Sequence, residues 1–452
     1  MGLDLARIFK AYDVRGVVPS EFDADIARAT GAAFVRLLGA TEIVIAHDMR
    51  DSSIPLSAAF ADGAVSQGAD VVLAGLGSTD LLYFAAGSMG IPGAMFTASH
   101  NPAKYNGIKM CRAGAAPIGQ ETGLAEIRDM VASGVPTATG RRGTVREVDL
   151  RDAYVAHLRT LVDLSGIRPL KVAVDAGNGM GGLTVPVAFD GLPVDLVPLY
   201  FELDGSFPNH EANPIEPENL RDLQAAVRDS GADIGLAFDG DADRCFVVDE
   251  RGGLVSPSTI TGLVVERELA REPGGTIIHN VIVSRAVPEL VSKLGGSPVR
   301  TRVGHSFIKA EMARTGAVFG GEHSGHFYFR DFWRADSGML AALHVLAALG
   351  GQSRPLSELL DGYAPYAVSG EINSEVADAQ ASMRSIEAAY ADEATDIDHM
   401  DGLTMSFADG SWFNLRPSNT EPLLRLNVEA GDDDAMSRRR DEVLASIRGG
   451  RD

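Results

Sequence analysis

Short apolar runs alternate with helix-length segments along most of this chain, and no other feature limits its fold as strongly. Three successive units each begin with a run rich in β-branched residues, continue through a segment of helical length and end in a second apolar run. Strands that alternate with helices predict α/β architecture, with helices covering the faces of each sheet. The units begin at Ile43–Ala46, Lys171–Asp175 and Thr276–His279 and end at Val71–Ala74, Ile234–Phe238 and Val299–Thr301.

The C-terminal segment has a different order, which is typical of a small α+β domain. Its helices are expected at Ala379–Glu393 and Asp434–Ile447, and between them lie strands at Gly402–Phe407, Trp412–Arg416 and Leu423–Glu429. A chain of 452 residues exceeds what one hydrophobic core organises. Segments rich in Gly, Pro, Ser or Thr mark the boundaries. We therefore expect four domains, at residues 1–140, 141–252, 253–366 and 367–452.

The formal charge of -22 and the pI near 4.8 argue against a nucleic-acid partner and against an anionic membrane surface. A small phosphorylated substrate stays compatible, because a few cations in a cleft outweigh a distant negative surface. The N-terminus carries Asp4, Arg7 and Lys10 and lacks the apolar run of a signal peptide, so we expect a cytoplasmic protein. Only two cysteines occur, Cys111 and Cys245, and free thiols are the simpler interpretation.

The longest uncharged stretch, Ser337–Ser353, contains His344 and a pair of glycines near its end. It is too short and too interrupted to cross a bilayer. We expect a buried helix there.

The segment Thr97-Ala-Ser-His-Asn-Pro102 follows an apolar run and predicts an exposed loop at the C-terminal end of a strand. Open α/β sheets bind ligands at such ends. Ser99 can carry a phosphoryl group there if a base or a metal activates its oxygen, and His100 lies next to it. The alternative is a turn or helix-capping serine, the commoner role of such a segment taken alone.

Asp239-Gly-Asp-Ala-Asp-Arg244 forms a carboxylate-rich turn between two strand-like runs. Three alternating aspartates need compensation if they are buried, and Mg²⁺ completed by a phosphate oxygen suits them. A calcium loop requires helical flanks and a glutamate at its twelfth position, which Glu250 does not occupy. A solvated acidic turn is the remaining alternative.

Gly320-Gly-Glu-His-Ser-Gly-His326 combines backbone freedom with groups that hydrogen-bond sugar hydroxyls. Zinc binding by His323 and His326 is the competing interpretation, but no third ligand is evident. Arg416-Pro-Ser-Asn-Thr-Glu-Pro422 offers a guanidinium, two hydroxyls and an amide from Arg416 to Thr420, which suits a phosphate. Taken alone, it could be a polar hairpin turn.

Gly177-Asn-Gly-Met-Gly-Gly182 matches the spacing G-x-G-x-x-G, with Glu202 downstream. A dinucleotide site is conceivable at this position. We disfavour it because the match lies in the middle of the chain and because Pro186 should interrupt the helix that receives the pyrophosphate.

Taken together and in this order, these segments resemble the α-D-phosphohexomutase superfamily, most closely its phosphomannomutase/phosphoglucomutase branch, over essentially the whole chain. In that family the first motif carries the phosphorylated serine, the aspartate loop binds Mg²⁺, the glycine-rich loop selects the sugar and the last loop binds the substrate phosphate. By this resemblance Ser99 is the phosphorylated serine and shares in metal binding, and the metal ligands are Asp239, Asp241 and Asp243. The sugar would be selected by Glu322, Ser324 and His326, and the substrate phosphate would be bound by Arg416, Ser418, Asn419 and Thr420. Shorter matches add Tyr12, Arg15, Lys109 and His305.

The resemblance also implies the fold and the chemistry. We expect three related α/β domains with mixed sheets and a smaller C-terminal α+β domain around one central cleft. Phosphoserine 99 would give its phosphoryl group to a hexose monophosphate, and the resulting hexose 1,6-bisphosphate, which is also the activator, would turn around and return its other phosphate. Arg244 and Mg²⁺ would offset charge, and Lys109 and His326 are candidates for proton transfer.

The expected substrate is mannose 6-phosphate, which would be converted to mannose 1-phosphate. Asn419 favours mannose or glucose over glucosamine, because the phosphoglucosamine branch usually has Gly there. Two positions depart from the family pattern, His323 where Met is frequent and Ile282 where some members have Lys. Glucose phosphates, alone or together with mannose phosphates, are therefore the alternative substrates.

A non-catalytic sugar-phosphate-binding relative and a phosphatase that uses the same serine are the rival functions. In each case the partner is a small hexose phosphate. The protein is expected to be a monomer or a homodimer.

Overall fold

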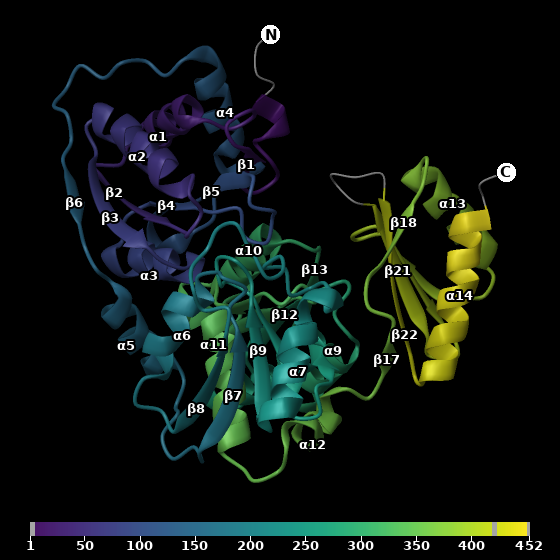
Figure 1. The fold of residues 1–452 in the computed structure, drawn as a ribbon. Coiled ribbons are helices and arrows are strands. Elements are labelled where there is room, and N and C mark those ends of the chain that lie inside the picture. Colours follow the sequence, from purple (N-terminus) through teal and green to yellow (C-terminus); the bar gives the residue numbers. More distant parts are fainter. Residues whose placement is uncertain (1–4, 418–422, 450–452) are drawn as a thin grey trace.

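Four β-sheets follow one another along the chain, and each is built from its own stretch of sequence (Figure 1). The structure is a computed structural model and describes residues 5–417 and 423–449. The first three sheets are covered by helices, and the fourth stands beside them with its helices on one side. This arrangement confirms the expected class of three α/β units followed by an α+β unit.

The first sheet is mixed and has the order β1-β5-β4-β2-β3-β6. Strands β2, β3, β4 and β6 run parallel, whereas β5 pairs antiparallel with both β1 and β4. Strand β6 lies beyond the expected boundary at residue 140 and completes this sheet. Its elements are β1 (Val14–Val17), α1 (Ala24–Leu38), β2 (Glu42–His47), α2 (Ser53–Ser66), β3 (Asp70–Leu76), α3 (Thr79–Met89), β4 (Gly93–Phe96), β5 (Tyr105–Cys111), α4 (Leu124–Ser133) and β6 (Val145–Glu147).

Helices α1 and α2 pack on one face of this sheet at very short range. A Cβ atom on Gly31 would lie 2.1 Å from the carbonyl oxygen of Phe60, and one on Gly63 would lie 2.0 Å from that of Arg28. Only glycine allows two helix backbones to approach this closely. Helix α3 lies against the other face, where it reaches the second and third units.

The second sheet has the order β11-β10-β9-β7-β8, with a parallel centre and antiparallel β10 and β11. The turn between β9 and β10 contains the three aspartates. Its elements are α5 (Arg151–Leu161), β7 (Leu170–Asp175), α6 (Gly181–Phe189), β8 (Val194–Leu199), α7 (Arg221–Ser230), β9 (Ile234–Phe238), β10 (Cys245–Asp249) and β11 (Leu254–Val255).

The third sheet has the order β13-β12-β14-β15-β16 and is again mixed. The glycine-rich loop connects β14 to β15. Its elements are α8 (Pro257–Arg271), β12 (Thr276–Asn280), α9 (Ala286–Lys293), β13 (Ser297–Thr301), α10 (His305–Thr315), β14 (Phe319–Gly321), β15 (Phe327–Phe329), β16 (Ala335–Asp336), α11 (Gly338–Gly350) and α12 (Leu356–Leu360).

Helix α11 confirms the buried helix expected in Ser337–Ser353. Nearly all its residues are inaccessible to solvent, and the Ser337 hydroxyl caps its N-terminus by accepting a hydrogen bond from the Leu340 amide. Among the described residues, none of the helices combines the length and the apolar character needed to cross a bilayer.

The fourth sheet has the order β17-β22-β21-β20-β19, and β18 also pairs with β22. The sequence predicted three of these strands and both helices but missed β17, β18 and β19. Its elements are β17 (Ala367–Val368), β18 (Ile372–Glu375), α13 (Ala379–Tyr390), β19 (Ala394–Asp398), β20 (Leu403–Phe407), β21 (Trp412–Pro417), β22 (Leu423–Ala430) and α14 (Asp433–Gly449).

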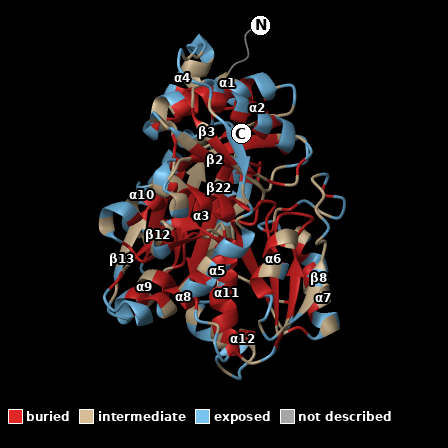
Figure 2. Ribbon diagram, turned by 90° about the vertical axis from the view of Figure 1, so that its left-hand side faces the viewer, coloured by how far each residue is buried: buried red, intermediate tan, exposed pale blue. Residues whose placement is uncertain are grey.

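The apolar cores divide the molecule unequally. One continuous cluster contains Val44 of the first sheet, Val172 of the second and Phe319 of the third, and it includes most of α11. The fourth unit packs around a separate cluster, which includes Met405 and Phe413. Figure 2 shows that α3 and α11, which both contribute to this cluster, are buried along most of their length. The first three units therefore form one packed body, which the fourth joins mainly through its surface.

Candidate active site

Ser99 lies in the loop that follows β4, and the first part of this loop, from Thr97 to Ser99, is buried. The exposed loop expected from the sequence is found only in its second part, where Pro102 and Lys104 are exposed. Ser99 is only 4% exposed because the aspartate loop of the second unit covers it. A Cβ atom on Gly240 would lie 2.4 Å from the carbonyl oxygen of Ser99, so the two loops touch through their backbones. The φ angle of Ser99 is +47°, in the left-handed region that non-glycine residues rarely adopt.

The Ser99 hydroxyl has acidic and basic neighbours. It donates a hydrogen bond to Asp239 Oδ2 at 2.6 Å, and its oxygen lies 3.2 Å from His100 Nδ1 and 3.4 Å from Arg244 Nη2. Arg244 Nε donates to Asp239 Oδ2 at 2.9 Å, which ties these groups together. Negative charge that develops on the serine oxygen would therefore meet a fixed guanidinium.

Burial shifts the acid–base properties of these neighbours. It raises the pKa of Asp239 to about 7, although Arg244 opposes the shift. Burial, with Arg244 as a second cause, lowers the pKa of His100 well below its usual range. Because the serine proton is directed at Asp239, the ring of neutral His100 can donate its Nδ1–H to the serine oxygen.

The three aspartates converge as the sequence predicted. One carboxylate oxygen from each of Asp239, Asp241 and Asp243 lies within 4.8 Å of the others, and all three side chains are buried. Asp241 Oδ1 and Asp243 Oδ1 have no hydrogen-bond partner within the described part of the chain. Buried, unpaired carboxylate oxygens of this kind fit a hard divalent cation.

Lys109 from β5 partly compensates this charge. Its Nζ donates to Asp241 Oδ2 at 2.7 Å and to Asp243 Oδ2 at 2.5 Å. Burial alone would lower the pKa of Lys109, but these two carboxylates raise it above its usual range. Burial alone would likewise raise the pKa of Asp241, but Lys109 brings it well below its usual range. The Oδ2 atoms of the loop thus face two fixed cations, Lys109 at Asp241 and Asp243 and Arg244 at Asp239.

Two further contacts place the aspartate loop. Thr79, at the start of α3, donates its hydroxyl to Asp241 Oδ2 at 2.6 Å and its amide to the Asp241 carbonyl at 3.0 Å. The glycine run that resembled a dinucleotide motif packs under the same loop, because a Cβ atom on Gly179 would lie 2.7 Å from the Gly240 carbonyl oxygen.

The expectation that Pro186 interrupts the following helix is wrong. Helix α6 runs from Gly181 to Phe189 and contains Pro186. Proline lacks the N–H group for one backbone hydrogen bond, but the helix continues through this position. The glycines serve close packing of two loops.

The glycine-rich loop brings His326 to the aspartates. His326 Nε2 lies 3.7 Å from Asp243 Oδ1, and its Nδ1 is 2.9 Å from the Ser324 hydroxyl. The other possible metal group among the described residues is Asp243, His326 and Asp336, which does not include His323. The pairing of His323 with His326 considered for zinc is therefore not part of a three-ligand cluster there.

Glu322 of this loop is buried, and its carboxylate is occupied by three donors. Oε1 accepts from Asn280 Nδ2 and from the Gly304 amide at 3.0 Å each, and Oε2 accepts from the Tyr328 hydroxyl at 2.6 Å. In this structure Glu322 therefore braces the loop against the start of α10.

Tyr12, Arg15 and His305 lie at the junction of the first and third units. The rings of Tyr12 and His305 have centroids 4.6 Å apart, and burial lowers the pKa of His305 to about 3. Arg15 Nη1 donates to Asn101 Oδ1 at 2.5 Å, which connects it to the Ser99 loop. The structure thus brings these three residues to the edge of the catalytic groups.

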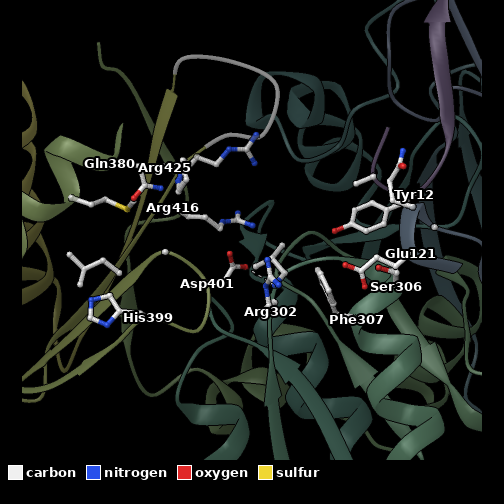
Figure 3. Close-up of a pocket in the computed structure, with 18 of the residues that line it drawn as sticks. Tyr12, Glu121, Arg302, Ser306, Phe307, Gln380, His399, Asp401, Arg416 and Arg425 are labelled. Carbon is white, nitrogen blue, oxygen red and sulfur yellow. Dashed lines mark hydrogen bonds between the residues drawn. The ribbon is translucent and has the colours of Figure 1, made fainter. Parts of the chain in front are cut away.

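Arg416 lies at the end of β21 and faces a separate space. It lines a cavity of about 910 Å³ together with Tyr12, Arg302 and Arg425, but none of the Ser99 or aspartate-loop residues is in the lining. Arg416 Nη2 and Arg425 Nη1 each lie 3.2 Å from the Glu371 carboxylate. Figure 3 shows both guanidiniums extending from the fourth unit toward the side where Tyr12 and Ser306 lie. Ser418, Asn419 and Thr420 lie outside the described residues.

Sequence reasoning missed three contributors to this site: Arg50, Thr79 and Arg425. Arg50 and Thr79 each follow a predicted strand closely, within polar runs such as Asp48-Met-Arg-Asp-Ser-Ser53. That position could have marked them, because strand ends face the ligand side of an α/β sheet. Arg425 lies within a strand, and no local signal distinguishes it.

The chain matches the four domain models described as phosphoglucomutase/phosphomannomutase alpha/beta/alpha domains I, II and III and C-terminal domain. The matched residues are 6–136, 152–253, 256–366 and 371–446. Together they cover nearly the whole chain.

Relatives of known name match at full length. The chain is 43% identical to a phosphomannomutase of Salmonella montevideo, over 96% of this chain and 98% of the relative. It is 42% identical to a protein named phosphohexose mutases from Xanthomonas campestris, over 97% and 98%. The crystal structure of a phosphoglucomutase/phosphomannomutase family protein from Burkholderia thailandensis superposes with a TM-score of 0.88 at 36% identity, covering 98% of this chain and 97% of that one.

Proposed function

The chain belongs to the phosphoglucomutase/phosphomannomutase family of the α-D-phosphohexomutases, and on this basis we propose that it is a phosphomannomutase. It would interconvert mannose 6-phosphate and mannose 1-phosphate through phosphoserine 99 and a hexose 1,6-bisphosphate. The observation that carries the proposal is the Ser99 hydroxyl, 2.6 Å from Asp239 Oδ2 and 3.4 Å from Arg244, in a chain 43% identical to a named phosphomannomutase.

The transfer proceeds in two balanced half-reactions. The bond between phosphorus and Ser99 Oγ breaks, a bond forms to the free hydroxyl of the sugar, and the proton of that hydroxyl passes to a base. The bisphosphate then turns around, its other phosphoryl group returns to Ser99 Oγ, and the base gives its proton to the sugar oxygen that has lost this group. The isomeric monophosphate then leaves. Arg244 stabilises the charge on the serine oxygen in both directions.

The remaining residues bind, orient and move protons. We assign the base to His326, whose Nδ1 is oriented by Ser324 at 2.9 Å. Lys109, held on two carboxylates, supplies positive charge or a proton. Asp239, Asp241 and Asp243 would hold Mg²⁺, which when bound offsets charge on the phosphoryl oxygens.

Substrate recognition is assigned to the edge of the site and to the cavity of about 910 Å³. Tyr12, Arg15, His305 and the glycine-rich loop would contact the sugar, and Arg416 with Ser418, Asn419 and Thr420 would bind the phosphate that is not transferred. We also propose a cytoplasmic enzyme, consistent with the two buried free thiols, that works as a monomer or a homodimer.

Incubation with mannose 6-phosphate, Mg²⁺ and a trace of hexose 1,6-bisphosphate tests the proposal. Mannose 1-phosphate should accumulate to an equilibrium mixture, without release of inorganic phosphate. Release of phosphate in step with substrate loss would indicate a phosphatase instead. Absence of turnover on any hexose phosphate would contradict the proposal, and parallel assays with glucose phosphates would show whether the enzyme has dual specificity.

A further inference from the structure

Arg50 is a fully buried cation directly behind the Ser99 loop. It lies in the connection between β2 and α2, and its side chain is 1% exposed. Strands β2 and β4 are parallel neighbours in which His47 pairs with Phe96, so the loops that follow them start side by side. A buried guanidinium is costly unless its charge and its donors are all satisfied.

Every N–H group of this guanidinium has an acceptor. Nε donates to Asp48 Oδ2 at 3.2 Å, and the other four donors all reach backbone carbonyls of the nucleophile loop. The accepting oxygens belong to Ser99 at 2.8 Å, Asn101 at 2.7 Å, and Pro102 and Tyr105 at 3.0 Å each. One side chain thus binds the whole segment from Ser99 to Tyr105, including the carbonyl of Ser99.

The second unit covers Arg50 from the other side. The ring of Phe207 lies 5.0 Å from the guanidinium carbon, and a Cβ atom on Gly205 would lie 2.6 Å from Arg50 Cα. The Ser99 carbonyl, which Arg50 binds, also touches Gly240 of the aspartate loop. Arg50 therefore lies where the nucleophile loop, the aspartate loop and the second unit meet.

We propose that Arg50 is a positioning residue for phosphoryl transfer. It keeps Ser99 in the left-handed conformation at φ +47°, so that the serine oxygen stays between Asp239 and Arg244. A non-glycine residue adopts this region only where its surroundings enforce it. The inference rests on the proposed function, because it assigns to Arg50 the geometry of the transferring oxygen.

Arg50→Lys tests this assignment, because lysine keeps the charge opposite Asp48 but has three donors in place of five and no planar fork. We expect kcat to fall about 100-fold, as for a misplaced reacting atom, with KM within roughly threefold of the wild type. The rate at which hexose 1,6-bisphosphate phosphorylates Ser99, followed by intact mass, should fall in parallel. Arg36→Lys, on the exposed side of α1, is the matched control and should leave kcat unchanged.

A second readout does not depend on activity. Amide hydrogen exchange over residues 97–107 should accelerate about tenfold in Arg50→Lys, while α1 and α14 keep the wild-type rates. Unchanged exchange in 97–107, or a folded Arg50→Lys with kcat within threefold of an active wild type, would overturn the inference. A wild type that lacks mutase activity would contradict the proposed function, and the exchange measurement would still decide the role of Arg50 in the loop.

Asp48→Asn covers the case in which Arg50→Lys does not fold. It removes the charged acceptor of Nε and leaves the four carbonyl contacts in place. A kcat about tenfold lower with unchanged KM, together with faster exchange in 97–107, supports the inference. Wild-type kcat and exchange in this variant would overturn it.

Discussion

The proposed catalytic centre and the Arg416 cavity differ in how fully their charges are already paired. At the centre, the side chains of Asp239, Asp241, Asp243 and Arg244 are at most 4% exposed, and most of their polar atoms have partners inside the protein. At the cavity, Arg425 is 32% exposed and shares Glu371 with Arg416, and Arg302 lies exposed over the ring of Phe307.

The two regions also rest on different cores. The proposed catalytic groups come from the first three units, which share one apolar cluster, whereas Arg416 belongs to the fourth unit with its own cluster. Polar contacts join the fourth unit to the third, among them Arg300 with Asp398 at 2.5 Å and the Val303 amide with Asp401 at 2.8 Å. Packing within the shared core thus fixes the proposed catalytic groups. The distance from Arg416 to Ser99 depends instead on the polar interface between the third and fourth units.

The largest expected effect removes the proposed nucleophile. Ser99→Ala should lower kcat by at least about 10⁴-fold, because it deletes the oxygen that we propose carries the phosphoryl group. Binding of mannose 6-phosphate should persist, since Ser99 does not line the cavity. Intact mass after incubation with hexose 1,6-bisphosphate should show no added phosphate. Ser133→Ala, at the exposed end of α4, is the control, and a phosphorylated Ser99→Ala protein would place the nucleophile elsewhere.

The next effect concerns the cation that we propose the three aspartates bind. Asp241→Asn should reduce activity about a thousandfold at saturating sugar phosphate and weaken Mg²⁺ binding measured by calorimetry. Asp229→Asn, on exposed α7 of the same unit, should change neither quantity. Wild-type Mg²⁺ affinity in Asp241→Asn would remove Asp241 from the proposed ligand set.

A smaller effect is expected when Arg416, which lines the cavity, is replaced. Arg416→Lys should raise KM for mannose 6-phosphate roughly 10- to 30-fold and lower kcat less, because lysine cannot bind a phosphate with a planar fork. The exposed Arg438→Lys serves as the control. If kcat fell instead with KM unchanged, Arg416 would belong with the fixed catalytic groups, and the contrast between the two regions would fail.

The smallest effect on activity is expected at Asp80, beneath the catalytic centre. Its carboxylate accepts hydrogen bonds from Ser78, Tyr154 and Ser337, and burial raises its pKa to about 6. Between pH 4 and 6 the folded protein therefore binds a proton that the unfolded chain does not. This contribution to stability is complete below pH 4 and is lost as pH rises through 6, by about 3 kcal/mol for a shift of two pKa units.

Asp80→Asn cannot titrate, so the stability difference between wild type and variant should decrease from pH 4 to pH 7. Urea unfolding at several pH values measures this difference. A difference that does not vary with pH would show that Asp80 keeps an ordinary pKa.

The sequence predicted the convergence of the three aspartates because the signal is local. They lie within five residues, in a turn between two apolar strands. Their burial was left open, because a solvated turn has the same sequence pattern. Strands β17, β18 and β19 were missed because they are short or polar and alternate with solvent-facing residues such as Asp396. Such strands form because the neighbouring strands β20 and β22 provide backbone hydrogen-bond partners for them.

The contacts that complete the site are long-range, and this is why sequence reasoning did not find them. Thr79 and Asp241 are 162 positions apart, and Arg50 and Ser99 are 49 apart. The buried state of Ser99 has the same origin, because the loop that covers it comes from another unit. The spacing of Gly177 to Gly182 matches a dinucleotide motif for a related reason. Two closely packed loops require glycine, and so does a backbone that approaches a bound phosphate.

The two buried cysteines give the separation between the shared core and the core of the fourth unit a practical consequence. Cys111 and Cys245 are 0% and 2% exposed, and both lie in the core shared by the first three units. The fourth unit contains no cysteine. An alkylating reagent can reach these thiols only when the shared core opens. The rate of labelling therefore measures the opening of that core and not of the fourth unit. Loss of the fourth unit on heating would leave both thiols unlabelled, and the chain thus contains its own reporter for the order in which its parts unfold.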